Sequence, residues 1–145
     1  MKIKVKKLSE SASLPARGSV YAAGYDLRAD IPGELTILPQ ENALIPTGLS
    51  MEIPEGYFGG IFARSGLASK ESLRPANCVG VIDSDYRGPV MVSLHNDSME
   101  TRVISPQERI AQLVIIPFLA AEFDEAEELD ETDRGAGGFG STGKE

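Results

Sequence analysis

Short apolar runs, some of them alternating with polar residues at period two, most constrain the fold of this chain. No stretch repeats apolar residues at the period of a long helix. Ile3 and Val5 alternate with lysines, and Leu49, Met51 and Ile53 alternate with polar neighbours. Alternation at period two is typical of strands with one buried face. Further apolar runs span Tyr57–Phe62, Val79–Ile82, Val90–Leu94 and Leu113–Phe118. The pattern predicts an all-β barrel or sandwich.

Turn-forming residues separate these runs. They are Pro32-Gly33, Pro39, Pro46, Pro54–Gly56, Arg87–Pro89, Asn96-Asp97, Pro106 and Pro117. Proline and glycine interrupt regular pairing, so we expect loops at these places. We expect one short helix, which begins near Ser65 and runs through Glu71.

Composition sets the remaining bounds. A chain of 145 residues predicts one domain with a modest core. The hydrophobic content is 41% without a long apolar run, so no membrane helix is expected. The basic N-terminus lacks the apolar stretch of a signal peptide. Cys78 is the only cysteine, which excludes an intramolecular disulfide and predicts a reducing, cytoplasmic location.

Charge is concentrated at the C-terminal end. Of the formal net charge of −8, residues 1–120 carry 12 basic and 13 acidic side chains, and residues 121–145 carry 2 and 9. An acidic segment of this kind repels nucleic-acid backbones and extends in solution. We therefore expect a β-barrel body over 1–120, an acidic linker over 121–133 and a glycine-rich tail over 134–145.

The tail has the composition of a nucleotide clamp. It holds five glycines, Arg134, Phe139 and the pair Ser141-Thr142. Glycine-rich backbone can turn N–H groups toward an anion, and arginine is a forked donor for phosphate. An aromatic ring offers a face on which a base can stack. The competing interpretation is a flexible terminus.

Two further segments carry polar groups after apolar strands. Arg64, Ser65 and Gly66 open the expected helix, whose free N–H groups favour phosphate, although a turn with a helix cap is the competing interpretation. Asp83 and Asp85 would share one side if the preceding strand continues, so one could act as a base. An Asx-type turn is the alternative there.

Other polar residues leave more than one interpretation open. Asn77 can read a base edge or simply form a turn. Asp26 can support the water shell of a metal, orient an arginine or form a buried salt bridge. Gln112 lies opposite Leu113 in an alternating run and can contact phosphate or water. The single histidine, His95, is expected to be structural.

Five segments in this order resemble the trimeric dUTPase family. They are Ala23–Leu27, Arg64–Ala68, Gly80–Gly88, Arg109–Leu113 and Arg134–Gly143. The resemblance implies a jelly-roll-like β-barrel protomer and a homotrimer with active sites between subunits. It also implies magnesium-dependent hydrolysis of dUTP to dUMP and pyrophosphate, without nucleic-acid or membrane partners.

The resemblance also implies roles for single residues. Asp83 would be the general base, Tyr86 would pack on the deoxyribose, and Asp85 has a less defined role. Uracil would be bound by Asn77, Gly80 and Ile82, and the phosphates by Arg64, Ser65, Gly66 and Gln112. The tail residues Arg134, Gly138, Gly140, Ser141 and Thr142 would close over the γ-phosphate while Phe139 stacks on uracil. Magnesium would be held by phosphates and waters, with Asp26 in indirect support.

Two other functions fit a chain of this kind. One is a dCTP deaminase-like or bifunctional nucleotide enzyme on the same fold. The other is a nucleotide sensor without catalytic activity. Asp83, Arg64 and Phe139 are all present, which favours the enzyme.

Overall fold

The computed structural model of the chain describes residues 1–138 and confirms an all-β protein with one short helix. Its elements are β1 (Lys4–Lys7), β2 (Ala16–Arg17), β3 (Tyr25–Arg28), β4 (Leu35–Ile37), β5 (Asn42–Glu52), β6 (Tyr57–Phe62), α1 (Ser65–Glu71), β7 (Leu73–Pro75), β8 (Gly80–Ile82), β9 (Val90–Asn96), β10 (Arg102–Ile104) and β11 (Arg109–Pro117). Over the described residues the helix has seven residues, and no helix is long and apolar enough to cross a membrane.

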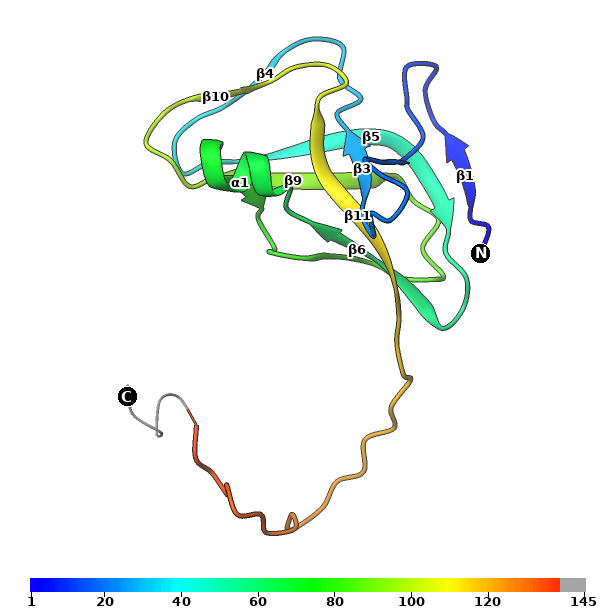
Figure 1. Cartoon of the computed structure of the whole chain (residues 1–145), viewed down its shortest axis with the longest axis vertical. Coiled ribbons are helices and arrows are strands. Elements are labelled where there is room, and N and C mark those ends of the chain that lie inside the picture. Colours follow the sequence, from blue (N-terminus) through cyan, green and yellow to red (C-terminus); the bar gives the residue numbers. More distant parts are fainter. Residues whose placement is uncertain (139–145) are drawn as a thin grey trace.

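Two larger antiparallel sheets form the body. One has the order β1-β5-β9-β7, the other has the order β2-β3-β11-β6-β8, and β10 and β4 form a separate pair. Figure 1 shows these strands gathered in one body, from which the chain after β11 extends away. Because β8 ends the five-stranded sheet, one of its edges has no neighbouring strand among the described residues.

The core lies between the sheets and follows from alternation along the strands. In β9, Val90, Val92 and Leu94 are buried, whereas the residues between them are half-buried. Leu27 of β3 and Ile110 of β11 are buried from the opposite sheet. Burial of each aliphatic side chain contributes about 1.5–3 kcal/mol. The predicted period-two pattern therefore identifies the inner faces correctly.

The structure corrects two expectations about strand boundaries. A loop was predicted at Pro46, but this residue lies inside β5, where the pairing with β9 shifts between Pro46 and Leu49. A bulge tolerates proline because no ladder donor is needed there, and the Pro46 carbonyl accepts the Asp30 N–H at 2.8 Å. The short strands β2, β4, β7 and β10 were not predicted, since two or three residues cannot display alternation.

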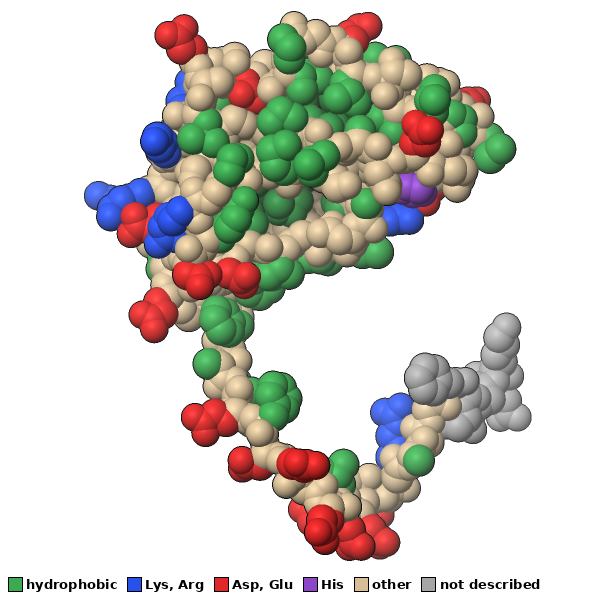
Figure 2. Space-filling view, turned by 180° about the vertical axis from the view of Figure 1, so that it is seen from behind, with side chains coloured by type: hydrophobic (Ala, Val, Ile, Leu, Met, Phe, Trp, Pro, Cys, Tyr) green, Lys and Arg blue, Asp and Glu red, His purple; other side chains and the backbone are tan. Residues whose placement is uncertain are grey.

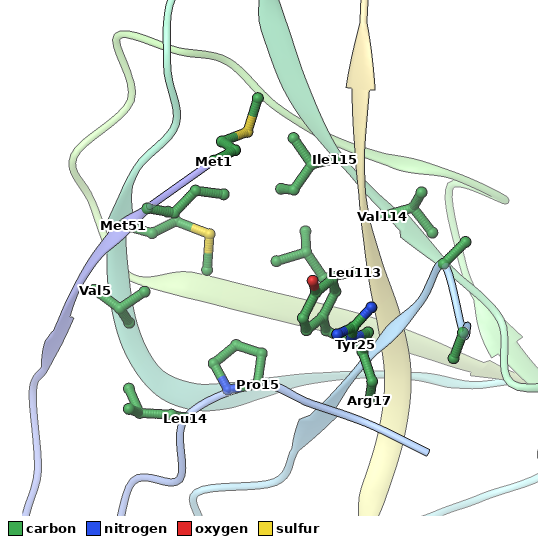
Figure 3. A pocket seen from close by; sticks show the side chains of 13 residues that line it. Met1, Val5, Leu14, Pro15, Arg17, Tyr25, Met51, Leu113, Val114 and Ile115 are labelled. Carbon is green, nitrogen blue, oxygen red and sulfur yellow. The ribbon is translucent and has the colours of Figure 1, made fainter. Parts of the chain in front are cut away.

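An apolar groove opens between the edge strands of the two sheets. It measures about 540 Å³, and its lining includes Met51, Leu113 and Ile115, as Figure 3 shows. At its rim the Arg17 guanidinium lies 5.6 Å from the centre of the Tyr25 ring. None of the predicted site residues within 1–138 lines this groove.

Candidate active site

Two arginines converge on Asp26 at one end of the five-stranded sheet. Arg64 Nε lies 2.9 Å from Asp26 Oδ1, and Arg109 Nη1 lies 3.2 Å from Asp26 Oδ2. Arg64 Nη1 also donates to the Arg109 carbonyl at 3.2 Å. Both oxygens of Asp26 are thus used by guanidinium groups, as the prediction that it orients an arginine requires. We call Arg64, Asp26, Arg109 and Gln112 the Arg64 cluster.

Gln112 braces the turn that precedes Arg64. Its Nε2 donates to the Ala63 carbonyl at 2.9 Å, and β11 pairs it with Asp26 on one side and Phe62 on the other. A Cβ at Gly24 would lie 2.2 Å from the Gln112 Oε1, so a side chain there would displace the amide. The structure therefore gives Gln112 a backbone partner, and its contact with phosphate stays a prediction.

The predicted helix begins at Ser65, directly after this turn. Arg64 occupies the N-cap with extended backbone (φ −84, ψ 129) and makes no side-chain cap hydrogen bond. Ser65 and Gly66 are exposed, whereas Leu67 is buried and anchors the helix. The first helical N–H groups have no intrahelical acceptors, so this exposed start can donate to an anion.

The edge strand β8 presents backbone on its free side. Gly80 and Ile82 are buried and Val81 is 62% exposed. Asn77 is exposed and precedes the strand, with its Nδ2 3.5 Å from the place of a Cβ at Gly80. A flat polar ring could therefore bind along this edge between an amide side chain and free backbone groups.

Asp83 stands at the end of β8, where the strand stops. The chain turns at once, and the Tyr86 N–H donates to the Asp83 carbonyl at 3.2 Å. Asp83 and Asp85 are both exposed. Because β8 ends at Ile82, the condition under which both carboxylates would share one strand face is not met, and the chain turns there instead. We call residues 83–89 the Asp83 turn.

A hollow beside the Asp83 turn has four acidic residues among the nine that line it. It measures about 680 Å³, and its lining includes Glu52, Glu55, Asp83, Asp85 and Arg87. Four carboxylates against one guanidinium repel a polyanion. The hollow therefore disfavours a polyanion unless additional cations balance these carboxylates.

Tyr86 is fixed within the same turn. Its hydroxyl donates to the Pro89 carbonyl at 3.0 Å, and its side chain lies against Gly88. A Cβ at Gly88 would be 2.4 Å from the Tyr86 hydroxyl oxygen and 2.6 Å from Cζ. The missing side chain at Gly88 thus sets the position of the Tyr86 ring.

The two groups lie at opposite corners of the sheet. Asp26, Gln112 and Phe62 are aligned in register, whereas Ile82 aligns with Gly59. A rise of 3.3 Å per residue and a strand spacing near 4.8 Å separate Asp26 from Asp83 by about 13 Å along the strands and about 14 Å across them. The Arg64 cluster and Asp83 are therefore roughly 20 Å apart within this chain.

The chain after β11 extends away from the body toward the glycine-rich tail, as Figure 1 shows. Residues 117–136 are exposed, and Arg134 Nε donates to the Gly137 carbonyl at 2.8 Å within the tail itself. Gly138 is the last described residue. The predicted contacts of Phe139, Gly140, Ser141 and Thr142 fall outside the residues that the structure describes. Figure 2 shows acidic side chains along this extended segment.

Sequence reasoning did not assign three residues that the structure brings into the site. Arg109, Gly24 and Gly88 all lie inside the five segments that resemble the dUTPase family. Their closeness in sequence to a predicted site residue was the one signal that could have identified them. His95 lies elsewhere, with Nδ1 2.7 Å from Asn42 Oδ1 and Nε2 3.2 Å from Asp97 Oδ1.

No group of three or more His, Cys, Asp or Glu side chains within residues 1–138 is arranged to hold a metal ion. Asp26 already pairs with two arginines.

The whole chain is similar to known proteins of one kind. The dUTPase family model matches residues 10–143. A deoxyuridine 5'-triphosphate nucleotidohydrolase of Nautilia profundicola is 51% identical over 99% of this chain and 100% of its own length. The enzyme of the same name from Desulfitobacterium hafniense is 49% identical over 99% of this chain and 95% of its own.

Solved structures agree in fold. A mutant dUTPase of Staphylococcus bacteriophage 80alpha, solved with dUpNHpp, has a TM-score of 0.90 and 32% identity, and the match covers 99% of both chains. A mutant dUTPase of phage phi11 of S. aureus, solved to show a structural Mg(II) ion, has a TM-score of 0.79 and 30% identity over 88% of this chain and 98% of its own. With a matching family model over most of its length and relatives of about half identity, this chain belongs to the dUTPase family.

Proposed function

We propose that this chain hydrolyses dUTP to dUMP and pyrophosphate by attack of water on the α-phosphorus. The reaction keeps uracil out of DNA and supplies dUMP for dTMP synthesis. Membership in the dUTPase family supports the activity, as do the relatives named deoxyuridine 5'-triphosphate nucleotidohydrolase. The observation that carries it is an exposed carboxylate, Asp83, at the end of a strand whose free edge can bind a base.

Uracil binds along the free edge of β8. Backbone groups on the free edge of β8, which runs from Gly80 to Ile82, pair with the uracil edge, and the Asn77 amide supplies a donor and an acceptor. Paired polar groups of this kind reject a base whose donors and acceptors are exchanged, because buried groups would be left unpaired. The pocket therefore favours uracil over cytosine.

The sugar lies against Tyr86. The ring is held from below by Gly88 and through its hydroxyl by Pro89. A ring fixed in this way leaves no space for a 2′-hydroxyl, so a ribonucleotide meets a steric clash rather than a lost contact. Tyr86 thus selects deoxyribose.

Asp83 is the general base. Its exposed carboxylate accepts a hydrogen bond from the attacking water, orients it and takes its proton as the bond to phosphorus forms. A carboxylate is a weak base in bulk water, so the rate depends on positioning and on closure of the site.

The phosphates are bound by Arg64, Ser65 and Gly66, with Gln112 beside them. In a working site, three contacts of about 3 Å each link the general base to the phosphate-binding arginine. They run from Asp83 to the water, from the water to phosphorus, and from a phosphate oxygen to the guanidinium, and together they span only roughly 10 Å. Asp83 and the Arg64 cluster of one chain are roughly 20 Å apart, which is about twice that reach. This separation supports a site shared between copies of the chain, and the family resemblance makes the assembly a homotrimer.

Magnesium fits this arrangement as a cation held by phosphate oxygens and water. Asp26 contributes by holding Arg64 and Arg109, which then contact the phosphates. When bound, the ion neutralises part of the negative charge of the triphosphate. Removal of divalent ions with a chelator should stop turnover, and added Mg²⁺ should restore it.

The tail closes the site. Arg134 and Gly138, with Gly140, Ser141 and Thr142, bind the γ-phosphate, and Phe139 stacks on uracil. Residues 121–133 act as the linker between body and tail, since those residues are exposed and acidic. Closure over a complete triphosphate excludes water other than the nucleophile.

Pyrophosphate release tests the function. The full chain with Mg²⁺ is assayed with dUTP, dCTP, dTTP and UTP. The proposed cytoplasmic location is tested separately, by measuring the same activity in the cytoplasmic fraction of cells that produce the protein. We expect release from dUTP alone. Ammonia from dCTP would instead indicate a deaminase, and nucleotide binding without turnover in folded protein would indicate a sensor.

A further inference from the structure

The turn that carries Asn77 joins the edge strands of the two larger sheets. β7 ends at Pro75 in the four-stranded sheet, and β8 begins at Gly80 in the five-stranded sheet. The Cys78 N–H donates to the Pro75 carbonyl at 3.0 Å, and Cys78 has a positive φ of 62°. A residue other than glycine keeps this left-handed conformation where its surroundings impose it. The turn around Asn77 therefore needs support from outside its own residues.

Arg74 supplies such support from β7. Its Nη1 donates to the Pro75 carbonyl at 3.2 Å and lies 3.5 Å from the Ala76 carbonyl oxygen. The Pro75 carbonyl thus accepts both the N–H that closes the turn and a guanidinium N–H. The Ala76 N–H donates to the Ser93 carbonyl of β9 at 2.8 Å. The backbone that leads into Asn77 is therefore held by one guanidinium and by β9.

Asp97 fixes the direction of that guanidinium. Its Oδ2 accepts Arg74 Nε at 2.7 Å, and its Oδ1 accepts Arg74 Nη2 at 3.0 Å. Asp97 is itself held in place, because its N–H donates to the Ser72 carbonyl at 2.9 Å and its Oδ1 lies 3.2 Å from His95 Nε2. A two-point contact between arginine and carboxylate sets the plane of the guanidinium. The remaining nitrogen, Nη1, is thereby directed at the turn.

The exposure of this pair indicates a local role rather than support of the whole fold. The side chains of Arg74 and Asp97 are 37% and 40% exposed, and ion pairs in such contact with water contribute little to stability. Asn77 depends on the turn more directly. Its Nδ2 lies 3.5 Å from the place of a Cβ at Gly80, so the amide lies beside the backbone of β8. A shift of about 1 Å would take this amide out of hydrogen-bond range of a base.

We infer that Arg74 and Asp97 are positioning residues for base recognition, which hold the turn in the shape that presents the Asn77 amide to uracil. This inference rests on the proposed function, in which Asn77 binds the base. Neither side chain is assigned a step of the hydrolysis. Loss of the pair should therefore weaken binding of the nucleotide and leave the rate of the bound complex close to that of the wild type.

Arg74→Ala tests the inference, with Glu100→Gln as the matched control. Glu100 also pairs with an arginine, Arg102, at 3.2 Å, and that arginine donates to the Glu71 carbonyl at 2.9 Å instead of to the Asn77 turn. KM and kcat are measured from pyrophosphate release with dUTP, the Kd of dUMP by titration calorimetry, and folding by circular dichroism. We expect Arg74→Ala to raise KM and Kd about three- to tenfold with kcat within about twofold of the wild type. Glu100→Gln should leave all three values unchanged.

Two further variants keep the inference open to contradiction. Asp97→Asn tests the same pair if Arg74→Ala does not fold. On an Asn77→Ala background, Arg74→Ala should raise KM no further, because the arginine acts through that amide. The inference is overturned by a folded Arg74→Ala or Asp97→Asn protein with wild-type KM and Kd. An equal further loss on the Asn77→Ala background also overturns it.

Calorimetry separates this inference from the proposed function. A wild type that binds dUMP but releases no pyrophosphate from dUTP would contradict the hydrolase. The Kd of dUMP for Arg74→Ala would still test the turn, since that measurement does not depend on turnover. A rise in Kd would support the positioning role, and an unchanged Kd would contradict it.

Discussion

The two halves of the candidate site are held in place by different parts of the chain. Asp26, Arg109 and Gln112 come from β3 and β11 and fix Arg64 through contacts between residues up to 83 positions apart. The Asp83 turn is fixed mainly by its own neighbours, with Tyr86 bonded to Pro89 three residues later. One half thus depends on how strands pair, and the other on local turn geometry.

This difference teaches where preorganisation comes from. A phosphate site must hold charges against their mutual repulsion, which requires a counter-charge from another strand. A sugar-binding site needs only an aromatic ring held in one position, and the hydrogen bonds of a short turn can hold it there. Damage to the first half should therefore affect stability and activity together, and damage to the second should affect activity or selectivity alone.

Asp83→Asn should have the largest effect. It removes the general base from the turn while keeping the side-chain shape, so kcat should fall roughly 10²–10⁴-fold. Steady-state pyrophosphate release measures it. Asp85→Asn, two residues away and equally exposed, is the control and should lose much less. Equal losses in both variants would show that the assignment of the base to Asp83 is wrong.

Deletion of residues 134–145 should come next. Loss of Arg134 and the other tail donors should lower turnover by about 10²-fold or more, because phosphate donors act in the transition state. Among the described residues, the hydrogen bonds of residues 134–137 reach one another and Thr132 and none reaches the β-barrel body, so the oligomeric state and the melting temperature should stay unchanged. Full activity of the truncated chain, or its unfolding, would contradict the closing role.

Asp26→Asn should lower activity and stability together. Asp26 is 18% exposed and holds two guanidinium groups, so its loss should cost about 1–3 kcal/mol of unfolding free energy. We expect kcat/KM for dUTP to fall about tenfold as both arginines shift. Asp30→Asn is the control, since Asp30 accepts two serine hydroxyls at 2.6 Å outside the site. It should lower the melting temperature without lowering kcat/KM.

Gly24→Ala tests the same half without touching a charge. The new methyl group displaces the Gln112 amide from the Ala63 carbonyl and loosens the turn before Arg64. KM for dUTP should rise several-fold, with a small drop in melting temperature. Gly33→Ala has open space and should match the wild type in both measurements. An unchanged KM would show that the position of Gln112 does not affect binding of the phosphates.

Gly88→Ala should have the smallest effect on dUTP and a specific effect on the sugar. Its methyl group pushes the Tyr86 ring away from the turn. Discrimination between dUTP and UTP, measured as the ratio of kcat/KM values, should fall several-fold while the melting temperature holds. Gly18→Ala, with nothing near its side-chain position, is the control. On a Tyr86→Ala background, Gly88→Ala should have no further effect.

Much of the local structure was predictable from the chain. Val90, Val92 and Leu94 alternate with half-buried residues, and this pattern alone places them in the core. The helix was predicted from Ser65 through Glu71, where the structure has it. Its first residues and the buried Leu67 follow one another directly in the sequence, so the signal is local. Pro46 within β5 was missed, since its tolerance depends on a bulge and on Asp30.

The sequence by itself determined the β-strand pattern, the family and the segments that carry chemistry, because each depends on residues that are neighbours along the chain. Only the tertiary structure decided that Asp26 joins Arg64 and Arg109, that Gln112 occupies the space left by Gly24, and that Asp83 stands at the far corner of the sheet. These relations depend on strand order and register. A shift in register moves every side chain of a strand relative to its partners, and no local pattern records it.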